Sequence, residues 1–391
     1  MSIIFYKLRQ STIKQLENAN SALRAGHNLK ATHLYEQVLK KDLLKLFYDS
    51  DKDYGWTIDL DSEVSFHHAV ILLSDYFSQT KSPAHWFRIS AILIRHPDYQ
   101  SLNINDRIRI DLINIQRNMA RNIKVNETLE RLLNYLSFDT LEPLIEGLIH
   151  YTIAIIGVVI RDEKMAFLHQ RKANKLISAD EEPYYYLMNY EHHATIYYML
   201  NNNRRLYYEK AIQIYTETEE QARLLDMGHD FTYNGYNLGW IYAELELFEE
   251  AIHHFRRTIT EAESTHNAIM VAKCEYGLGH VYSCLKDYDR SIEYLEDALF
   301  YFVDESYLYN AACLNLFAGS LLAMGNIEQA IIRLNYATDN LAKVDNPVQL
   351  HHVYRHYSIA YFMKKDFIKA TKYFIKTYRL RLQYKMPLLP Y

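Results

Sequence analysis

Residues 236–257 read YNLGWIYAELELFEEAIHHFRR, and this stretch decides the fold. A large apolar residue and a small one stand side by side at Leu238 and Gly239, with an aromatic residue at Tyr242. A second small residue follows at Ala251, and a second aromatic residue at Phe255. Two helices approach each other closely only where a side chain is very small, and aromatic side chains fill the space beside such a contact. The stretch therefore predicts two packed helices joined by a short turn.

The same pattern recurs three more times toward the C-terminus. Its small residue moves from Gly239 to Gly279, Ala318 and Ser358, in steps of about 40 residues, a spacing typical of helical repeats. The later copies contain Gly277, Leu278, Tyr282, Ser291, Leu295 and Ala298, then Phe317, Leu321, Ala330, Leu334 and Ala337, then Tyr357, Tyr361, Ala370 and Phe374. This is the tetratricopeptide pattern, which predicts an all-α, right-handed superhelix with a binding groove.

Weaker copies precede these four. One contains Ala154, Gly157, Ala166 and Ala173, and the next contains Ala194, Tyr197, Ala211 and Tyr215. Before residue 100 the pattern is lost, although helical periodicity is clear at 9–25, 29–48, 62–78 and 84–95, with a loop at 51–56. We find no strand alternation. The prediction is an N-terminal helical bundle over 1–100, which binds a partner, and a repeat domain over 101–391, which binds a peptide.

Composition excludes several classes of protein. The formal charge of −5 gives no general attraction for nucleic acid, and the helix at 29–39 carries few side chains suited to reading bases. The longest apolar run, 153–160, is too short to cross a bilayer, so we expect a cytoplasmic protein without a membrane partner. Cys274, Cys284 and Cys313 lack metal spacing and are expected to be small buried apolar residues.

The stretch quoted above also resembles the Rap family of cytosolic bacterial regulators, peptide-controlled quorum sensors that bind response regulators. The resemblance rests on Tyr236–Tyr242 and Phe248–Arg257, on the repeat period and on the chain length, and it covers residues 140–385 better than 1–100. It implies a short signalling peptide in the repeat groove, and a response regulator or another cytosolic protein as partner. The identity of both, the direction of the switch and the oligomeric state are left open.

The resemblance also bears on catalysis. Family phosphatases carry Phe-Arg-His-Gln in the N-terminal bundle, where Gln orients the water that attacks an aspartyl phosphate. The corresponding stretch here is Phe66-His67-His68-Ala69, so Phe66 and His68 are expected at the partner surface while Ala69 cannot orient water. We predict no catalytic residue. The alternatives that stay open are a phosphatase and a repeat scaffold that takes no small ligand.

Helix periodicity then assigns the groove residues. An amide at Asn237 can pair with the backbone of an extended peptide, and the resemblance implies the same role; the alternative is a capping or interhelical hydrogen bond. The same offsets give the other candidate peptide-binding residues: Tyr233, Tyr236, Trp240, Lys273, Tyr276, His280, Asn315, His352, Arg355, His356, and Glu191 with His192 from the preceding copy.

Two further features are assigned to ordinary surface or groove chemistry. His352 and His356 have the i, i+4 spacing of metal ligands, but no acidic third ligand lies nearby in sequence, so we predict neither a metal nor a cofactor. The last helix carries eight Lys or Arg residues between Lys364 and Lys385 against one acid, Asp366. That pattern is typical of a solvated capping helix; the alternatives are a patch for an acidic partner and a weak attraction for nucleic acid.

Overall fold

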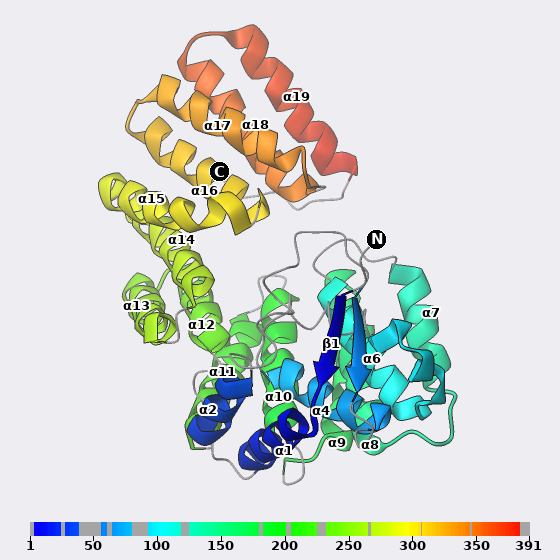
Figure 1. The fold of residues 1–391 in the computed structure, drawn as a ribbon. Coiled ribbons are helices and arrows are strands. Elements are labelled where there is room, and N and C mark those ends of the chain that lie inside the picture. Colours follow the sequence, from blue (N-terminus) through cyan, green and yellow to red (C-terminus); the bar gives the residue numbers. More distant parts are fainter. Residues whose placement is uncertain are drawn as a thin grey trace. The chain divides into compact units, whose positions relative to one another are not determined.

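The chain forms a series of helices that falls into two compact units, residues 1–230 and 231–391 (Figure 1). We call them unit 1 and unit 2 and describe each by itself. The computed structural model describes residues 4–24, 28–38, 56–60, 65–79, 93–118, 125–179, 183–200, 205–224, 232–264, 267–305, 307–344 and 346–383. The predicted loop at 51–55 and most of the predicted helix at 84–95 lie outside these residues.

Unit 1 begins with a small bundle. Its elements are β1 (Ile4–Leu8), α1 (Gln10–Arg24), α2 (Asn28–Val38), β2 (Trp56–Leu60) and α4 (Phe66–Gln79). Ile13 and Leu16 on α1, Ala31 on α2 and Leu73 on α4 are fully buried in one core, because apolar residues three to four apart share one face of a helix. The helices predicted at 9–25, 29–48 and 62–78 are thus present within the described residues.

The prediction that the chain has no strand is wrong. β1 and β2 pair in parallel, with Ile4 opposite Trp56 and Leu8 opposite Leu60 (Figure 1). The sequence Trp-Thr-Ile-Asp-Leu at 56–60 does alternate apolar and polar residues, but five residues are too few to stand out beside long helical patterns. The parallel pairing joins segments about fifty residues apart, which no local pattern predicts.

The rest of unit 1 consists of helices that lead into hairpins. They are η2 (Pro97–Ser101), α6 (Ile104–Asn118), α7 (Val125–Tyr135), α8 (Pro143–Val159), α9 (Glu163–Leu176), α10 (Pro183–Met199) and α11 (Arg205–Leu224). α8 pairs with α9, and α10 with α11, as the two weak repeat copies predict. At the first hairpin, a Cβ on Gly157 would lie 2.7 Å from the backbone nitrogen of Ala166, so this contact requires glycine.

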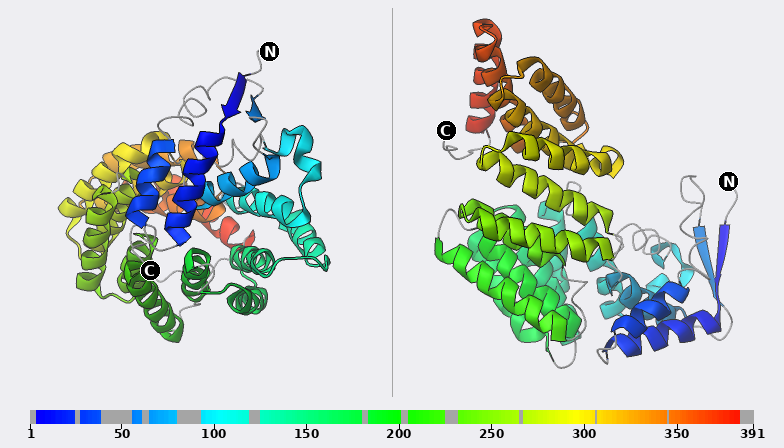
Figure 2. Two further views of the ribbon diagram at one scale, coloured as in Figure 1. Left: turned by 60° about the horizontal axis from the view of Figure 1, so that its bottom comes forward. Right: turned by 90° about the vertical axis from the view of Figure 1, so that its left-hand side faces the viewer.

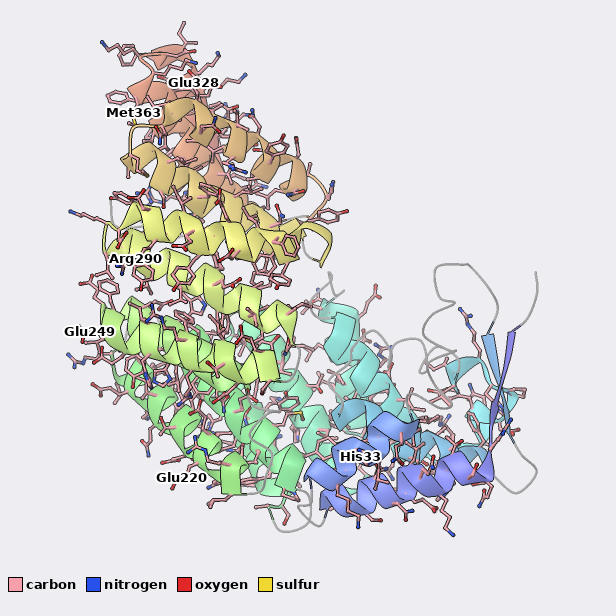
Figure 3. All side chains as sticks on the ribbon, turned by 60° about the vertical axis from the view of Figure 1, so that its left-hand side comes forward. His33, Glu220, Glu249, Arg290, Glu328 and Met363 are labelled. Atoms are coloured by element: carbon pink, nitrogen blue, oxygen red, sulfur yellow. The ribbon has the colours of Figure 1, made fainter. Side chains whose placement is uncertain are left out.

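Unit 2 is a stack of four helical hairpins (Figure 2). The helices are α12 (Thr232–Glu244), α13 (Phe248–Ser264), α14 (Ala268–Cys284), α15 (Tyr288–Glu305), α16 (Tyr307–Ala323), α17 (Ile327–Leu341), α18 (Pro347–Met363) and α19 (Phe367–Gln383). The hairpin turns follow one edge of the stack, where Glu249, Arg290 and Glu328 mark the starts of the second helices (Figure 3). The all-α tetratricopeptide fold is therefore confirmed, with the two-stranded β1–β2 ribbon as an addition.

The compact units divide at 230/231, with the hairpins α8–α9 and α10–α11 in unit 1. The predicted division near residue 100, into a partner-binding bundle and a peptide-binding repeat domain, stays a prediction. Cys274 and Cys313 are buried as predicted, but Cys284 is exposed, with its Sγ 3.7 Å from Nε2 of His280. In the described part of the chain, no helix has the length and apolarity needed to span a membrane.

Candidate functional site

The first helices of the four hairpins of unit 2 lie next to one another in the order α12, α14, α16, α18. The predicted groove residues of unit 2 lie on these helices, and we call the surface that they define the first-helix face. It comprises Tyr233, Tyr236 and Trp240 on α12, Lys273, Tyr276 and His280 on α14, Asn315 on α16, and His352, Arg355 and His356 on α18.

The aromatic members on α12 and α14 form one contiguous cluster. Tyr236 stands between Tyr233 and Trp240, with ring centroids 6.3 Å from each. Across the helix pair, the Trp240 ring lies 5.6 Å from Tyr276 and 5.2 Å from His280. Beneath them, Phe255 of α13 lies 5.8 Å from Trp240 and anchors the cluster on the core. The indole Nε1 of Trp240 is buried, and no described residue forms a hydrogen bond with it.

Lys273 stands at one end of this cluster. Its Nζ donates a 2.8 Å hydrogen bond to Oη of Tyr233 and lies 4.8 and 4.9 Å from the ring centroids of Tyr233 and Tyr309. Burial lowers the pKa of Lys273, but the hydroxyls of Tyr309 and Tyr233 outweigh it, so the net shift is upward and the ammonium stays charged. The residue is only 8% exposed, whereas Tyr233 above it is 38% exposed. The ammonium is thus buried, and the tyrosine that accepts its hydrogen bond is exposed.

A second, polar cluster lies on α16 and α18. Nδ1–H of His356 donates to Oδ1 of Asn315 at 2.8 Å, which leaves Nε2 as the unprotonated ring nitrogen. Burial, followed by the charge of Arg355 and by His352, lowers the pKa of His356 to about 4. The pKa of His352 is lowered in the same way, by burial first and then by His351 and Arg355. These histidines are therefore neutral at physiological pH, and Arg355 is the cation among them.

Asn237 lies half-buried on α12, one residue before the buried Leu238, and it takes part in an interaction within the chain. The structure therefore leaves both sequence interpretations of Asn237 open. On the same helix, Asn234 is fully buried, and among the residues that the structure describes neither Nδ2 nor Oδ1 of its amide has a hydrogen-bond partner. The sequence patterns had not singled out Asn234, since nothing in the repeat pattern marks that position.

Glu191 and His192 belong to unit 1, apart from the clusters above. His192 is buried, and its Nδ1–H donates to Oε1 of Gln170 at 2.9 Å. Gln170 also bonds to the side chains of Asn174 and Asn189, at 2.9 and 2.8 Å. Burial, followed by the neighbouring His193, lowers the pKa of His192 to about 3. The ring of His192 is thus hydrogen-bonded to a buried cluster of amide side chains on α9 and α10, which we call the amide network.

The stretch aligned with the phosphatase motif lies at the start of α4. Phe66 is buried and stacked on His96 at 4.0 Å, and Ala69 is 1% exposed in the bundle core. Both side chains are therefore enclosed in the bundle, and the role of Phe66 at a partner surface stays a prediction. His68 is half-exposed, with Nε2 2.6 Å from Oε1 of Glu17, and His67 pairs with Asp106 at 2.6 Å. The sequence alone gave no sign of these two ion pairs, because their acids lie on α1 and α6.

A separate hollow of about 970 Å³ lies at the turn between α8 and α9. Ile160, Phe167 and Leu168 form its apolar part, and its charged part is mixed: Arg161, Lys164 and Arg171 with Asp162 and Glu163. None of the predicted site residues lines it. Across the described residues, no group of three or more His, Cys, Asp or Glu side chains is arranged to hold a metal ion.

Comparisons with known proteins agree with this geometry at the level of the fold. The tetratricopeptide repeat family matches residues 231–299, which begin one residue before α12 and end within α15. No curated protein matches the sequence significantly. The family match covers less than half of the chain, so it identifies the repeats and not the whole protein.

Several solved structures are similar over most of the chain. A signal transduction ATPase with a tetratricopeptide repeat sensor from Pyrococcus horikoshii gives a TM-score of 0.58 at 14% identity over 96% of this chain, which spans 64% of that protein. The apo form of the quorum sensor NprR from B. thuringiensis gives 0.51 at 14% identity, covering 95% of this chain and 99% of NprR. The apo form of RapI gives 0.52 at 14% identity, covering 71% and 99%. At these identities the chain is similar in fold: a tetratricopeptide-type helical repeat protein with Rap and NprR among its structural neighbours.

Proposed function

We propose that this protein is a cytosolic, peptide-responsive regulator that holds a short peptide on the first-helix face and binds a signalling protein, such as a response regulator, through unit 1. The observation that carries the proposal is the cluster of Tyr233, Tyr236, Trp240 and Tyr276 beside the buried cation Lys273. NprR, a structural neighbour with a TM-score of 0.50 and 15% identity over 93% of this chain and 86% of NprR, has been solved in complex with its cognate peptide NprX.

The chemistry of this cluster suits an extended peptide with a carboxylate. Tyrosine and tryptophan give large contact areas at a small entropic cost, since each has only two side-chain torsions. A carboxylate can replace the Tyr233 hydroxyl as acceptor for Lys273, because Tyr233 is the exposed member of that pair. Asn237 is the candidate for pairing with the peptide backbone.

The partner site is proposed on the α4 surface of unit 1, where His68 and Glu17 form an exposed ion pair. Phe66 and Ala69 are left out because both are buried. Peptide and partner then act on each other by thermodynamic linkage: a peptide that changes the affinity for the partner tenfold has its own affinity changed tenfold by the partner. We do not propose phosphatase catalysis, since nothing at position 69 can orient a water molecule.

The test is calorimetric titration of the full chain with short synthetic peptides from a small exported precursor encoded beside its gene. The expected result is binding by the wild type, and a tenfold or greater loss of affinity for Asn237→Ala and for Lys273→Met, since unpaired polar groups in an interface cost about 1–3 kcal/mol each. Peptides with an amidated C-terminus should bind the wild type more weakly than the free acids do, and they should bind the wild type and Lys273→Met with equal affinity.

Leu206→Ala is the control, because Leu206 is 57% exposed and lies on α11 of unit 1, a helix that contributes no residue to the first-helix face. Melting curves show whether each variant is folded. If folded Asn237→Ala and Lys273→Met bind as the wild type does, the peptide does not use this face. If no peptide binds the wild type, the scaffold function becomes the better explanation. Loss of phosphate from a phosphorylated receiver domain on addition of the protein would contradict the regulatory proposal in its non-catalytic form.

A further inference from the structure

The last helix of unit 2, α19, exposes more large apolar side chains than the last helix of a repeat stack normally does. Its exposed large apolar side chains recur three, four and seven residues apart, so they share one side of the helix, and we call them the α19 stripe. They are Phe367, Ile368, Phe374, Ile375, Tyr378 and Leu382, with exposed fractions of 58, 85, 59, 44, 51 and 62%. Capping helices of repeat arrays normally present a polar outer face, so this stripe calls for an explanation.

The other hairpins show what normally covers such a stripe. Phe255, Leu295 and Leu334 hold the same repeat position as Phe374, and all three are 0% exposed. Phe255 is covered by the next first helix, because a Cβ on Gly277 of α14 would lie 2.5 Å from the Phe255 ring. Each first helix packs in this way on the hairpin before it, as α18 packs on α16 and α17. Phe374 therefore lies where a further first helix would pack.

The charges beside the stripe indicate which helix fits. Lys372 and Arg379 border it, and within the described residues neither makes an ion pair. Lys369, by contrast, is paired with Asp366 at 3.2 Å, and Lys376 lies over the Tyr354 ring at 4.8 Å. Two copies of α19 meeting through their stripes would bring these cations together, which disfavours a second copy of this chain.

Lys372 and Arg379 therefore favour an occupant whose side chains beside the stripe are acidic. We propose that the α19 stripe is the docking surface for an acidic amphipathic helix of a partner protein, which lies where a further first helix would lie and places its carboxylates against Lys372 and Arg379. The proposal is independent of the peptide on the first-helix face.

The test uses a synthetic 17-residue helix that carries the packing face of α14, with Gly at the place of Gly277 and Glu at its remaining positions. A second peptide has Lys in place of each Glu. Fluorescence anisotropy with the full chain should show binding of the Glu peptide at least tenfold tighter than of the Lys peptide. The substitutions Ile368→Glu and Ile375→Glu together should weaken it at least tenfold, and Lys372→Glu with Arg379→Glu should weaken it at least threefold.

Ile332→Glu is the matched control, since Ile332 is 43% exposed on α17, outside the stripe, and this variant should bind as the wild type does. Melting curves confirm that the exposed substitutions leave the fold intact. Equal affinity for both peptides, or unchanged affinity in the Ile368→Glu, Ile375→Glu variant, overturns the proposal.

The wild type, the variants above and a chain that ends at Gln383 distinguish three other possible occupants of the stripe. A wild-type dimer in sedimentation that the double variant loses would assign the stripe to a second copy. Capture by anionic phosphatidylserine vesicles without binding of the Glu peptide would assign it to a membrane surface. Binding of the Glu peptide only to a chain ending at Gln383 would assign it to residues 384–391. Each of these results overturns the proposed acidic partner.

Discussion

At the scale of single residues, unit 2 depends on close contacts between glycines and one aromatic ring. A Cβ on Gly239 would lie 2.6 Å, and one on Gly277 2.5 Å, from the ring of Phe255, which is fully buried. The ring thus sits between the two glycines, one on its own hairpin and one on the next. Since a buried ring has little room to move, these positions tolerate no larger side chain.

Gly277→Ala should lower the stability of unit 2. The added methyl group overlaps Phe255, and overpacking of this kind costs about 1–3 kcal/mol, which exceeds the gain of about 1 kcal/mol from better helix propensity. Thermal melting of the full chain measures it. Gly319→Ala is the control, because its Cβ would lie 3.2 Å from Cε1 of the half-buried His356. A variant Gly277→Ala as stable as Gly319→Ala would contradict this packing.

Buried histidines should make unit 1 sensitive to acid. The folded-state pKa of His192 is about 3, lowered by burial and by His193, whereas an unfolded chain has the ordinary value near 6.5. Between these values the unfolded state binds more protons, so stability falls as pH falls, by up to about 2 kcal/mol per such histidine at pH 5. His150, whose Nδ1 lies 2.9 Å from Nδ1 of His169, adds to the effect, because burial and His169 lower its pKa to about 4.

The measurement is the melting temperature of wild type, His192→Gln and His253→Gln between pH 7.5 and pH 5. His192→Gln should lose part of the acid sensitivity, whereas His253→Gln should keep it, because His253 is exposed. If the melting temperature falls equally with pH in all three proteins, burial in the amide network does not lower the pKa of His192.

At the scale of helices, local hydrogen bonds set where several elements begin. Asp162 accepts from the backbone N–H of Met165 at 2.9 Å at the start of α9, and Asn346 accepts from that of Gln349 at 2.9 Å at the start of α18. Asn326 occupies the same N-cap place before α17 but makes no such bond. One residue type thus stands at two helix starts with different contacts.

Asn346→Ala should destabilise unit 2 by about 1 kcal/mol, the usual cost of removing a side-chain cap. Asn326→Ala should cost less than half of that, because there is no side-chain hydrogen bond to lose. Chemical denaturation measures the difference: the midpoint and slope of each variant are compared with those of the wild type. If the two variants lose the same stability, the Asn346 cap contributes nothing beyond backbone preference.

At the scale of the whole molecule, the chain divides where one hairpin series meets another, at 230/231. Unit 2 has its own core clusters, which draw on residues of α12–α15 and of α14–α19. In a repeat array, stability comes from each hairpin and its nearest neighbours, so a self-contained series of hairpins can fold without the rest.

Residues 231–391 expressed alone should therefore fold as a helical protein. Far-UV circular dichroism should give a helical spectrum with a cooperative melt, and the full chain serves as the reference. An unfolded or non-cooperative fragment would show that unit 2 requires unit 1. The same fragment should retain the affinity for the acidic helix that we propose for the α19 stripe, since all six residues of the stripe lie on α19.

The sequence by itself determined the hairpins. The small residue at Gly239, the large one at Phe255 and their counterparts in the other repeats predict which helices pair. A close helix contact needs a small residue on one helix and a large one on the next, and the number of residues between them is read directly from the sequence. The same offsets selected Tyr233, Tyr236, Trp240, Tyr276 and His280, whose rings contact one another in the structure, while their role in peptide binding stays a prediction. Periodicity suffices for such sites because every member lies on one side of regular helices.

Only the tertiary structure decided what depends on contacts between distant segments. The parallel pairing of β1 with β2, the burial of Phe66 and Ala69, the commitment of His192 to Gln170 and the enclosure of Lys273 by Tyr309 all join residues from different elements. The exposure of Phe374 belongs here as well, since its repeat position predicts burial and only the lack of a described helix over it leaves it open. A local pattern gives the side of a helix on which a residue lies, whereas the packing of neighbouring elements decides whether that side is covered.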